Sequence, residues 1–222
     1  MTIALLVALA AAGTFLVRWS QPPERWYLAV AGPLSGPDSR LGIEMANAAD
    51  LAIAQANAAG GVDGRQIALL RYDDQGDPEV ARERAAEIVA DPRPLLVLGH
   101  RTSAPSIAAG EVYGEAGIPA ISGSATADEL TQDNPWYFRT IFTNSFQGSL
   151  LATYVHDILD HDTASVITTT RPYEQSLSTA FTTAFSEAGT VKETLALDRD
   201  NREASIQSIV DALAADPDPG IV

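Results

Sequence analysis

Hydroxyl side chains gather in two short segments that each follow a predicted β-strand. The first segment is Thr102-Ser103, and the second is Ser122-Gly123-Ser124-Ala125-Thr126. At the carboxyl ends of parallel strands, loops and helix N-termini present hydroxyls and backbone N–H groups to ligands. Together the two segments can cradle a carboxylate. Taken singly, each segment is more simply explained as a helix cap or a polar turn.

An acidic pair, Asp73-Asp74, follows another predicted strand. Paired carboxylates bind hard cations such as Mg²⁺, and a receiver domain uses an aspartate at such a position as its phosphoacceptor. The spacing lacks the longer alternating pattern, closed by a glutamate, that an EF-hand loop requires. Capping and turn formation account for Asp73, Asp74 and Asp77, since Asp77 precedes Pro78 where a helix is predicted to begin.

His100 stands close before Ser103, and histidine can serve as the base of a serine nucleophile. No nucleophile-elbow sequence surrounds this serine, so we interpret His100 as structural. The other histidines are too isolated to indicate a metal site, and no phosphate-binding loop is present. An enzyme that uses Asp73, Asp74 or His100 is kept only as an alternative. We expect no catalytic residues, no metal and no cofactor.

Short apolar runs alternate with longer helical stretches, which is typical of a parallel sheet covered by helices. The predicted strands are 26–31, 66–72, 94–98, 118–122, 164–169 and 191–197, with another beginning at 220–222. The predicted helices are 39–59, 78–90, one that ends near 117, 144–159, 174–188 and 202–214. We therefore expect an α/β fold in which four strand–helix steps form one lobe and a second series begins near residue 144.

The composition argues against several classes of protein. A net charge of −15, from 29 acidic and 14 basic residues, repels polyanions, so no nucleic-acid partner is expected. The absence of cysteine removes disulfides, thiolate metal sites and cysteine nucleophiles. A hydrophobic content of 46% supports a buried core rather than a disordered chain.

Residues 2–17 form an uninterrupted run of apolar and small side chains. The run lacks the basic n-region of a secretory signal and is slightly shorter than the ~17–25 residues of a membrane span. We favour a membrane anchor over a cleaved signal, and both place the remaining chain outside the cytoplasm. The predicted organisation is an anchor or signal plus linker at 1–25, a first α/β lobe at 26–143 and a partial second lobe at 144–222.

A series of short motifs follows in a definite order along the chain. It reads Ala31-Gly32-Pro33-Leu34-Ser35-Gly36, Ala58-Ala59-Gly60-Gly61-Val62-Asp63-Gly64, Tyr72-Asp73-Asp74-Gln75-Gly76-Asp77-Pro78, Gly99-His100-Arg101-Thr102-Ser103, Gly117-Ile118-Pro119, Ile121-Ser122-Gly123-Ser124-Ala125-Thr126, Glu129-Leu130-Thr131 and Phe138-Arg139-Thr140. In order and spacing this series resembles the leucine/isoleucine/valine-binding protein family, which are type I periplasmic substrate-binding proteins of ABC transporters. So many ordered motifs are far more specific than any one of them.

The resemblance implies the type I fold of two Rossmann-like lobes, with an amino-acid site between them. It implies that Ser103 and Thr126 donate hydroxyl hydrogen bonds to the ligand's α-carboxylate, within a binding segment that includes Ala125. The backbone carbonyl at Ser124 is then the acceptor for the ligand's ammonium group. Tyr173 resembles the aromatic residue that closes onto the ligand from the second lobe.

Two positions of the site depart from the family pattern. Leu41, a predicted ligand-binding position, stands where close relatives often carry a large aromatic residue, and Glu174 stands where glycine is usual. The family domain also continues through the rest of lobe two, supplies an acidic group for the ammonium and crosses back to lobe one. We therefore expect the second lobe of this chain to be incomplete.

The expected function is extracytoplasmic binding of a small solute, namely an amino acid of branched-chain type or a related carboxylate or amide. Besides this ligand, the expected partners are an ABC permease and a membrane contacted by the N-terminal segment. If the anchor is retained, ligand sensing coupled to signalling domains is the alternative. Two alternatives of other classes are an enzyme, which would show turnover, and an interaction protein that has lost the cleft, which would bind no small molecule.

Overall fold

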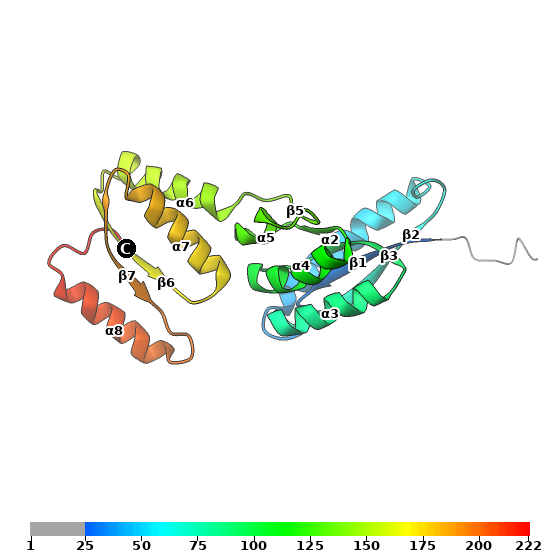
Figure 1. Cartoon of the computed structure of the whole chain (residues 1–222), viewed down its shortest axis with the longest axis horizontal. Helices are drawn as coiled ribbons and strands as arrows, with labels where there is room; N and C mark the ends of the chain where they lie inside the picture. Colours follow the sequence, from blue (N-terminus) through cyan, green and yellow to red (C-terminus); the bar gives the residue numbers. More distant parts are fainter. Residues whose placement is uncertain (1–24) are drawn as a thin grey trace, which may run out of the picture.

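The computed structural model describes residues 25–222, so the apolar run at 2–17 lies outside the described residues. Within the described part, no helix has the length and apolar character needed to cross a bilayer. The elements form two groups that lie end to end along the long axis of the molecule, each with its own sheet (Figure 1).

The first group, which we call the five-stranded lobe, contains a parallel sheet in the order β2-β1-β3-β4-β5. Its strands are β1 (Trp26–Gly32), β2 (Ile67–Asp73), β3 (Pro94–Gly99), β4 (Ala120–Ser122) and β5 (Tyr137–Arg139). Its helices are α2 (Ser39–Ala58), α3 (Pro78–Ala90), α4 (Ser103–Ala116) and the short α5 (Glu129–Gln132). Because all strands run parallel, their carboxyl ends share one edge of the sheet, where the segments that follow β3 and β4 lie.

Small side chains build the core of the five-stranded lobe. Ala29 and Ala31 of β1 and Ala81 and Ala85 of α3 are fully buried, so helix and sheet approach closely. Tyr113 of α4 is the largest fully buried side chain among the described residues. Helices α3 and α4 thus bury alanines in the core, whereas the alanine-rich α2 has few buried residues.

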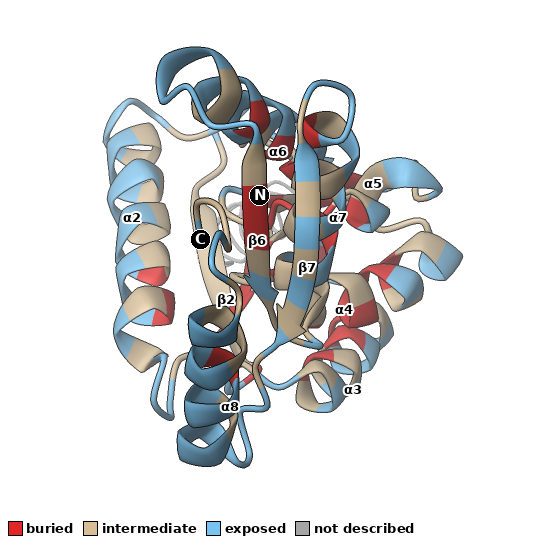
Figure 2. Cartoon of the chain, turned by 90° about the vertical axis from the view of Figure 1, so that its left-hand side faces the viewer, coloured by how far each residue is buried: buried red, intermediate tan, exposed pale blue. Residues whose placement is uncertain are grey.

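The second group, the two-stranded lobe, is smaller and less enclosed. It comprises α6 (Asn144–Thr153), a π-helical turn η1 (Tyr154–Ile158), β6 (Thr163–Thr168), α7 (Pro172–Phe185), β7 (Thr190–Ala196) and α8 (Arg202–Ala215). Strands β6 and β7 pair in parallel, and Ile221 forms a parallel bridge to Ala164 on β6. Buried residues gather on β6 and on α6 and α7, whereas β7 alternates between exposed and intermediate positions (Figure 2).

Helices α6 and α7 pack closely at a glycine. A Cβ added to Gly148 would lie 2.6 Å from the Cβ of Ala180 and 2.6 Å from the backbone nitrogen of Phe181. Phe185, Ala164 and Ala152 form the small core beneath this contact. The middle of α7 is thereby held against α6, and α6 follows directly on the segment that leaves the five-stranded lobe.

The α/β class with parallel sheets is confirmed, and most predicted strands and helices agree with the structure within a few residues. The sequence analysis missed α5 and β5, because β5 spans only Tyr137–Arg139 and is too short to show a period. The helix predicted at 144–159 is α-helical only to Thr153 and then becomes η1. The strand predicted at 220–222 is present as the single bridge of Ile221.

Candidate ligand-binding cleft

A cavity of about 480 Å³ lies between the two lobes, at the carboxyl ends of β3 and β4. This volume is within the roughly 300–1,000 Å³ usual for small-molecule sites. Residues of both lobes and of the segment that joins them line the cavity. They are Arg101, Thr102, Ser103, Ala104, Gly123, Ser124, Thr126, Ile141, Phe142, Gln147, Arg171, Pro172, Tyr173 and Glu174.

The hydroxyls of Ser103 and Thr126 have unused hydrogen-bonding capacity at this cleft. Ser103, only 2% exposed, accepts a hydrogen bond from the N–H of Ala127 at 3.3 Å and donates to no group among residues 25–222. The Oγ1 of Thr126 is buried and has no hydrogen-bond partner in the described structure. A buried polar atom without a partner costs about 1–3 kcal/mol, so both hydroxyls are available for an external acceptor.

The capping explanation for the first hydroxyl segment does not hold. Thr102 occupies the N-cap position of α4, yet its side chain accepts no hydrogen bond from the helix. Ser103 is the first helical residue, and its Oγ bonds to the segment after β4 instead. Ser103 is thus hydrogen-bonded to the residue that directly follows the second hydroxyl segment.

The remaining serines of the second segment have structural contacts. Ser124 Oγ donates to the carbonyl of Arg101 at 2.6 Å, and Ser122 Oγ donates to the carbonyl of His100 at 2.8 Å. The backbone carbonyl of Ser124 accepts no hydrogen bond from the described residues. Ala125 is 1% exposed in the core, and Leu41 lies in the first turn of α2. Neither Ala125 nor Leu41 is among the residues that line the cleft.

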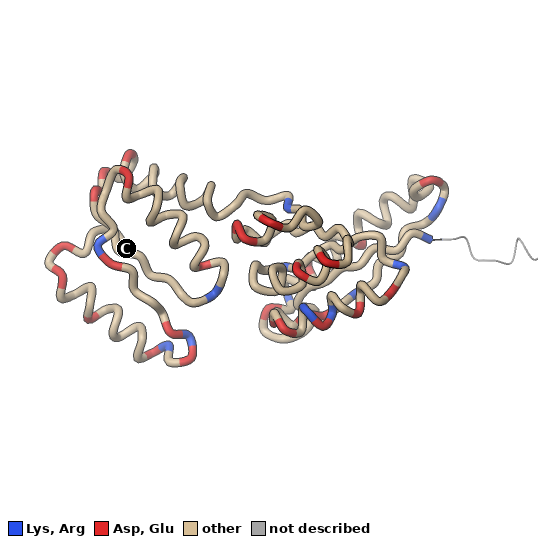
Figure 3. Tube along the Cα trace, viewed as in Figure 1, with Lys and Arg blue, Asp and Glu red and all other residues tan. Residues whose placement is uncertain are grey.

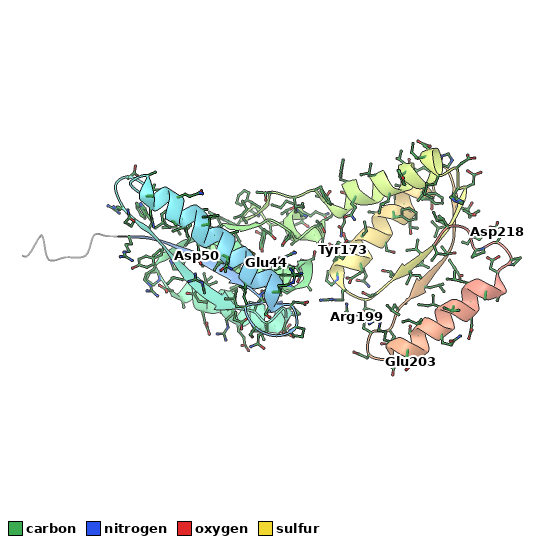
Figure 4. The ribbon with its side chains drawn as sticks, turned by 180° about the vertical axis from the view of Figure 1, so that it is seen from behind. Glu44, Asp50, Tyr173, Arg199, Glu203 and Asp218 are labelled. Carbon is green, nitrogen blue, oxygen red and sulfur yellow. The ribbon has the colours of Figure 1, made fainter. Side chains whose placement is uncertain are left out.

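Tyr173 reaches the cleft from the two-stranded lobe, in the first turn of α7. Its side chain is 38% exposed, and it lies at the end of α7 that faces the five-stranded lobe (Figure 4). Tyr173 and the hydroxyl segments thus line one cavity from opposite lobes. The adjacent Glu174 lines the same cavity.

Asn144, which the sequence analysis did not identify, connects the two walls of the cleft. Its N–H donates to the carbonyl of Thr126 at 2.8 Å, and its Nδ2 donates to the carbonyl of Tyr173 at 2.9 Å. A second connection is made by Asp128, which accepts from the N–H and Oγ of Ser145 at 2.9 and 2.7 Å. The only sequence signal was the predicted helix start at Asn144, which says nothing about these distant partners.

The acidic side chains that suggested other chemistry serve turns, caps and the core. Asp73 Oδ1 accepts from the N–H groups of Leu34, Ser35 and Gln75 at 2.8–3.1 Å. Asp77 caps α3 through the N–H groups of Glu79 and Val80. The turn and cap roles predicted for these residues are confirmed. In the described range 25–222, no three acidic or histidine side chains are grouped so as to hold a metal ion.

His100 and Asp74 are buried below the cleft and do not line it. Asp74 Oδ2 lies 2.6 Å from His100 Nδ1, and its Oδ1 accepts from the N–H of Gly76 at 2.8 Å. The other ring nitrogen of His100 lies 3.0 Å from the hydroxyl of Tyr113. This hydrogen-bonded chain links the ends of β2 and β3 to α4, in accordance with the structural role predicted for His100.

Asp73→Asn is expected to lower the free energy of unfolding by about 1 kcal/mol at pH 7, because charge-assisted hydrogen bonds become neutral ones. Burial acts to raise the pKa of Asp73, but hydrogen bonds from the Ser35 hydroxyl and three N–H groups outweigh it and lower the pKa. The stabilisation is therefore complete above the unfolded pKa of about 3.9 and disappears as the pH falls through the folded value. Urea unfolding of both proteins across this pH range tests the expectation, and a pH-independent difference contradicts it.

A model of the periplasmic binding protein family matches residues 26–216, which include both lobes and the cleft between them. The chain belongs to the periplasmic binding protein family. The family is made up of binding proteins rather than enzymes. The resemblance inferred from the ordered motifs is thereby confirmed.

Curated relatives of this periplasmic binding protein carry amino-acid names. The chain is 35% identical over 164 residues to Leu/Ile/Val-binding protein homolog 1 of Brucella abortus (strain 2308). It is 32% identical over 186 residues to the leucine-, isoleucine-, valine-, threonine-, and alanine-binding protein of Pseudomonas aeruginosa. These alignments cover 73% and 83% of this chain but 44% and 49% of the relatives. The chain thus spans about half the length of the curated relatives that it matches.

Solved structures of the family share the same fold. The branched-chain amino acid transporter substrate binding protein LivJ from Streptococcus pneumoniae, in complex with isoleucine, matches with a TM-score of 0.70 and 26% identity. That match covers 84% of this chain and 54% of the LivJ chain. The leucine binding protein LivK from Thermotoga maritima matches with a TM-score of 0.74 over 84% of this chain and 53% of the LivK chain. Because the sequence identity is 23%, this match supports the fold alone.

Proposed function

We propose that this protein binds a small amino acid of branched-chain type outside the cytoplasm, for import by an ABC transporter. The observation that carries the proposal is the pair of hydroxyls, Ser103 and Thr126, which have unused hydrogen-bonding capacity in a cavity between two lobes. Family membership supports an extracytoplasmic location and a binding role. The printed names of the relatives support the ligand class.

The proposed chemistry needs no cofactor. A carboxylate withdrawn from water is stabilised by hydroxyl and N–H donors, and hydrogen bonds to a charged group are roughly twice as strong as neutral ones. The Oγ–H groups of Ser103 and Thr126 supply two such donors from the five-stranded lobe. The carbonyl of Ser124 provides an acceptor for the ammonium group, and Tyr173 covers the ligand from the two-stranded lobe.

The two lobes have different roles in the proposal. The five-stranded lobe holds the charged end of the ligand, and the two-stranded lobe closes over it about the hydrogen bonds of Asn144 and Asp128. Acidic residues are spread over the helices and loops of both lobes (Figure 3). Attachment to a membrane through residues 2–17, and with it a sensing role, remains a prediction from the sequence.

Calorimetric titration of the purified full-length protein tests the proposed function. Leucine, isoleucine and valine are each expected to bind saturably at one site per chain. Leucinamide, which keeps the side chain and the ammonium group but lacks the carboxylate, is expected to bind at least tenfold more weakly, because it cannot accept from both hydroxyls as an anion. Equal affinity for leucine and leucinamide, or no binding of the three amino acids, contradicts the proposal.

A further inference from the structure

The carboxylate of Glu174 is an unexplained charged group at the cleft. Glu174 follows Tyr173 in the first turn of α7 and lines the cavity between the lobes. Its Oε2 is buried and has no hydrogen-bond partner among the described residues. Arg101 and Arg171 also line the cavity, yet within residues 25–222 neither forms an ion pair with Glu174.

Helix capping does not account for this carboxylate. In a capping box, a glutamate at the third helical position accepts from the backbone N–H of the N-cap residue. Here the N–H of the N-cap residue, Arg171, donates instead to Thr169 Oγ1 at 3.2 Å. The N–H of Gln175, which follows Glu174, donates to the carbonyl of Arg171. The α7 N-terminus therefore offers Glu174 a favourable dipole but no hydrogen bond.

An unpartnered carboxylate oxygen that is removed from water is costly, so a donor is expected to reach it in the working state of the protein. The hydroxyls of Ser103 and Thr126 line the cavity from the five-stranded lobe, and Glu174 lines it from the two-stranded lobe. A bound molecule that fills the cavity therefore meets the hydroxyl-bearing residues on one wall and the acidic residue Glu174 on the other. This arrangement is complementary to a zwitterion.

We propose that Glu174 accepts a hydrogen bond from the positively charged amino group of the ligand and so makes the cleft selective for amino acids over carboxylates that lack this group. The inference rests on the proposed function and adds a residue that determines specificity. A rival explanation is that Glu174 pairs with Arg101 when the lobes close. In that case its loss weakens every ligand equally, whatever charge the ligand carries.

The test compares leucine with 2-hydroxyisocaproate, in which a hydroxyl replaces the amino group of leucine. Glu174→Gln, which keeps the size of the side chain and removes its charge, is expected to weaken leucine binding about 10- to 100-fold. Binding of 2-hydroxyisocaproate is expected to change less than about threefold. Glu203→Gln is the matched control, because Glu203 lies in the first turn of α8 in the same lobe and does not line the cleft (Figure 4).

Each outcome of these titrations decides something different. If Glu174→Gln weakens both ligands to the same degree, the rival closure role is correct and the inference is overturned. If the folded variant binds leucine as tightly as the wild-type protein, the inference fails while the proposed function stands. If the wild-type protein binds neither ligand, the proposed function fails and the inference fails with it. Unfolding curves of the variants confirm that a loss of binding is not a loss of fold.

Discussion

Replacing Ser103 and Thr126 together by alanine is expected to weaken leucine binding by about two to four powers of ten. In the proposed binding mode each hydroxyl donates to the ligand's carboxylate. A hydrogen bond to a charged group contributes about 1.5–3 kcal/mol, so the sum corresponds to that loss if the contributions roughly add. Calorimetric titration of the purified full-length double variant against leucine measures the effect.

The same variant separates ligand binding from a structural role. Ser103→Ala also removes the acceptor for the N–H of Ala127, so we expect the free energy of unfolding to fall by about 1–3 kcal/mol. Ser149→Ala, at an exposed position on α6 away from the cavity, is the control and is expected to bind normally. A folded double variant with wild-type affinity would refute the carboxylate cradle.

Asp74→Ala is expected to lower the free energy of unfolding by about 2–4 kcal/mol. The carboxylate is fully buried, and its removal leaves the ring nitrogen of His100 and the N–H of Gly76 without partners. Each buried group that loses its partner costs about 1–3 kcal/mol, and the cavity left behind adds to the loss. Denaturant unfolding monitored by circular dichroism measures the change.

Two further variants show whether the loss arises from the buried contacts. Asp74→Asn keeps an oxygen that can accept a hydrogen bond, so it is expected to recover part of the stability. Asp50→Ala removes an exposed carboxylate that pairs with Arg71, and surface pairs of this kind contribute less than about 1 kcal/mol. An equally small effect for Asp74→Ala and Asp50→Ala would show that the Asp74–His100 contact is not structural.

The alternation of short apolar runs and helical stretches determined the α/β class and the position of most elements. Such patterns are local, because the apolar residues of a strand or a helix repeat with a fixed period over consecutive positions. Helix α3 is an example, because Asp77 and Pro78 predict its start. In the structure Asp77 is the N-cap and Pro78 lies in the first turn. The same locality explains why β5, only three residues long, was missed.

The sequence also placed Ser103 and Thr126 after neighbouring strands, since chain order and parallel pairing bring strand ends to one edge of a sheet. It did not distinguish Thr126 from Ala125 as a cleft residue. That distinction follows from the turn after β4, in which Ser122 Oγ accepts from the N–H of Ala125 at 3.0 Å and Ala125 enters the core. Which side chain of a turn faces a ligand depends on backbone angles that residue types alone do not determine.

Only the tertiary structure revealed the contacts of Asn144 and the surroundings of Glu174. Asn144 joins the carbonyls of Thr126 and Tyr173, which lie far from it along the chain and belong to opposite lobes. Likewise, the sequence does not show that folding buries Oε2 of Glu174 without a hydrogen-bond donor from the described residues. The sequence by itself thus determined the family, the fold class and the strand ends that meet at the cleft, because these depend on local pattern and chain order. The hydrogen-bonding capacity left for a ligand was decided by contacts between distant residues, which exist only once the chain has folded.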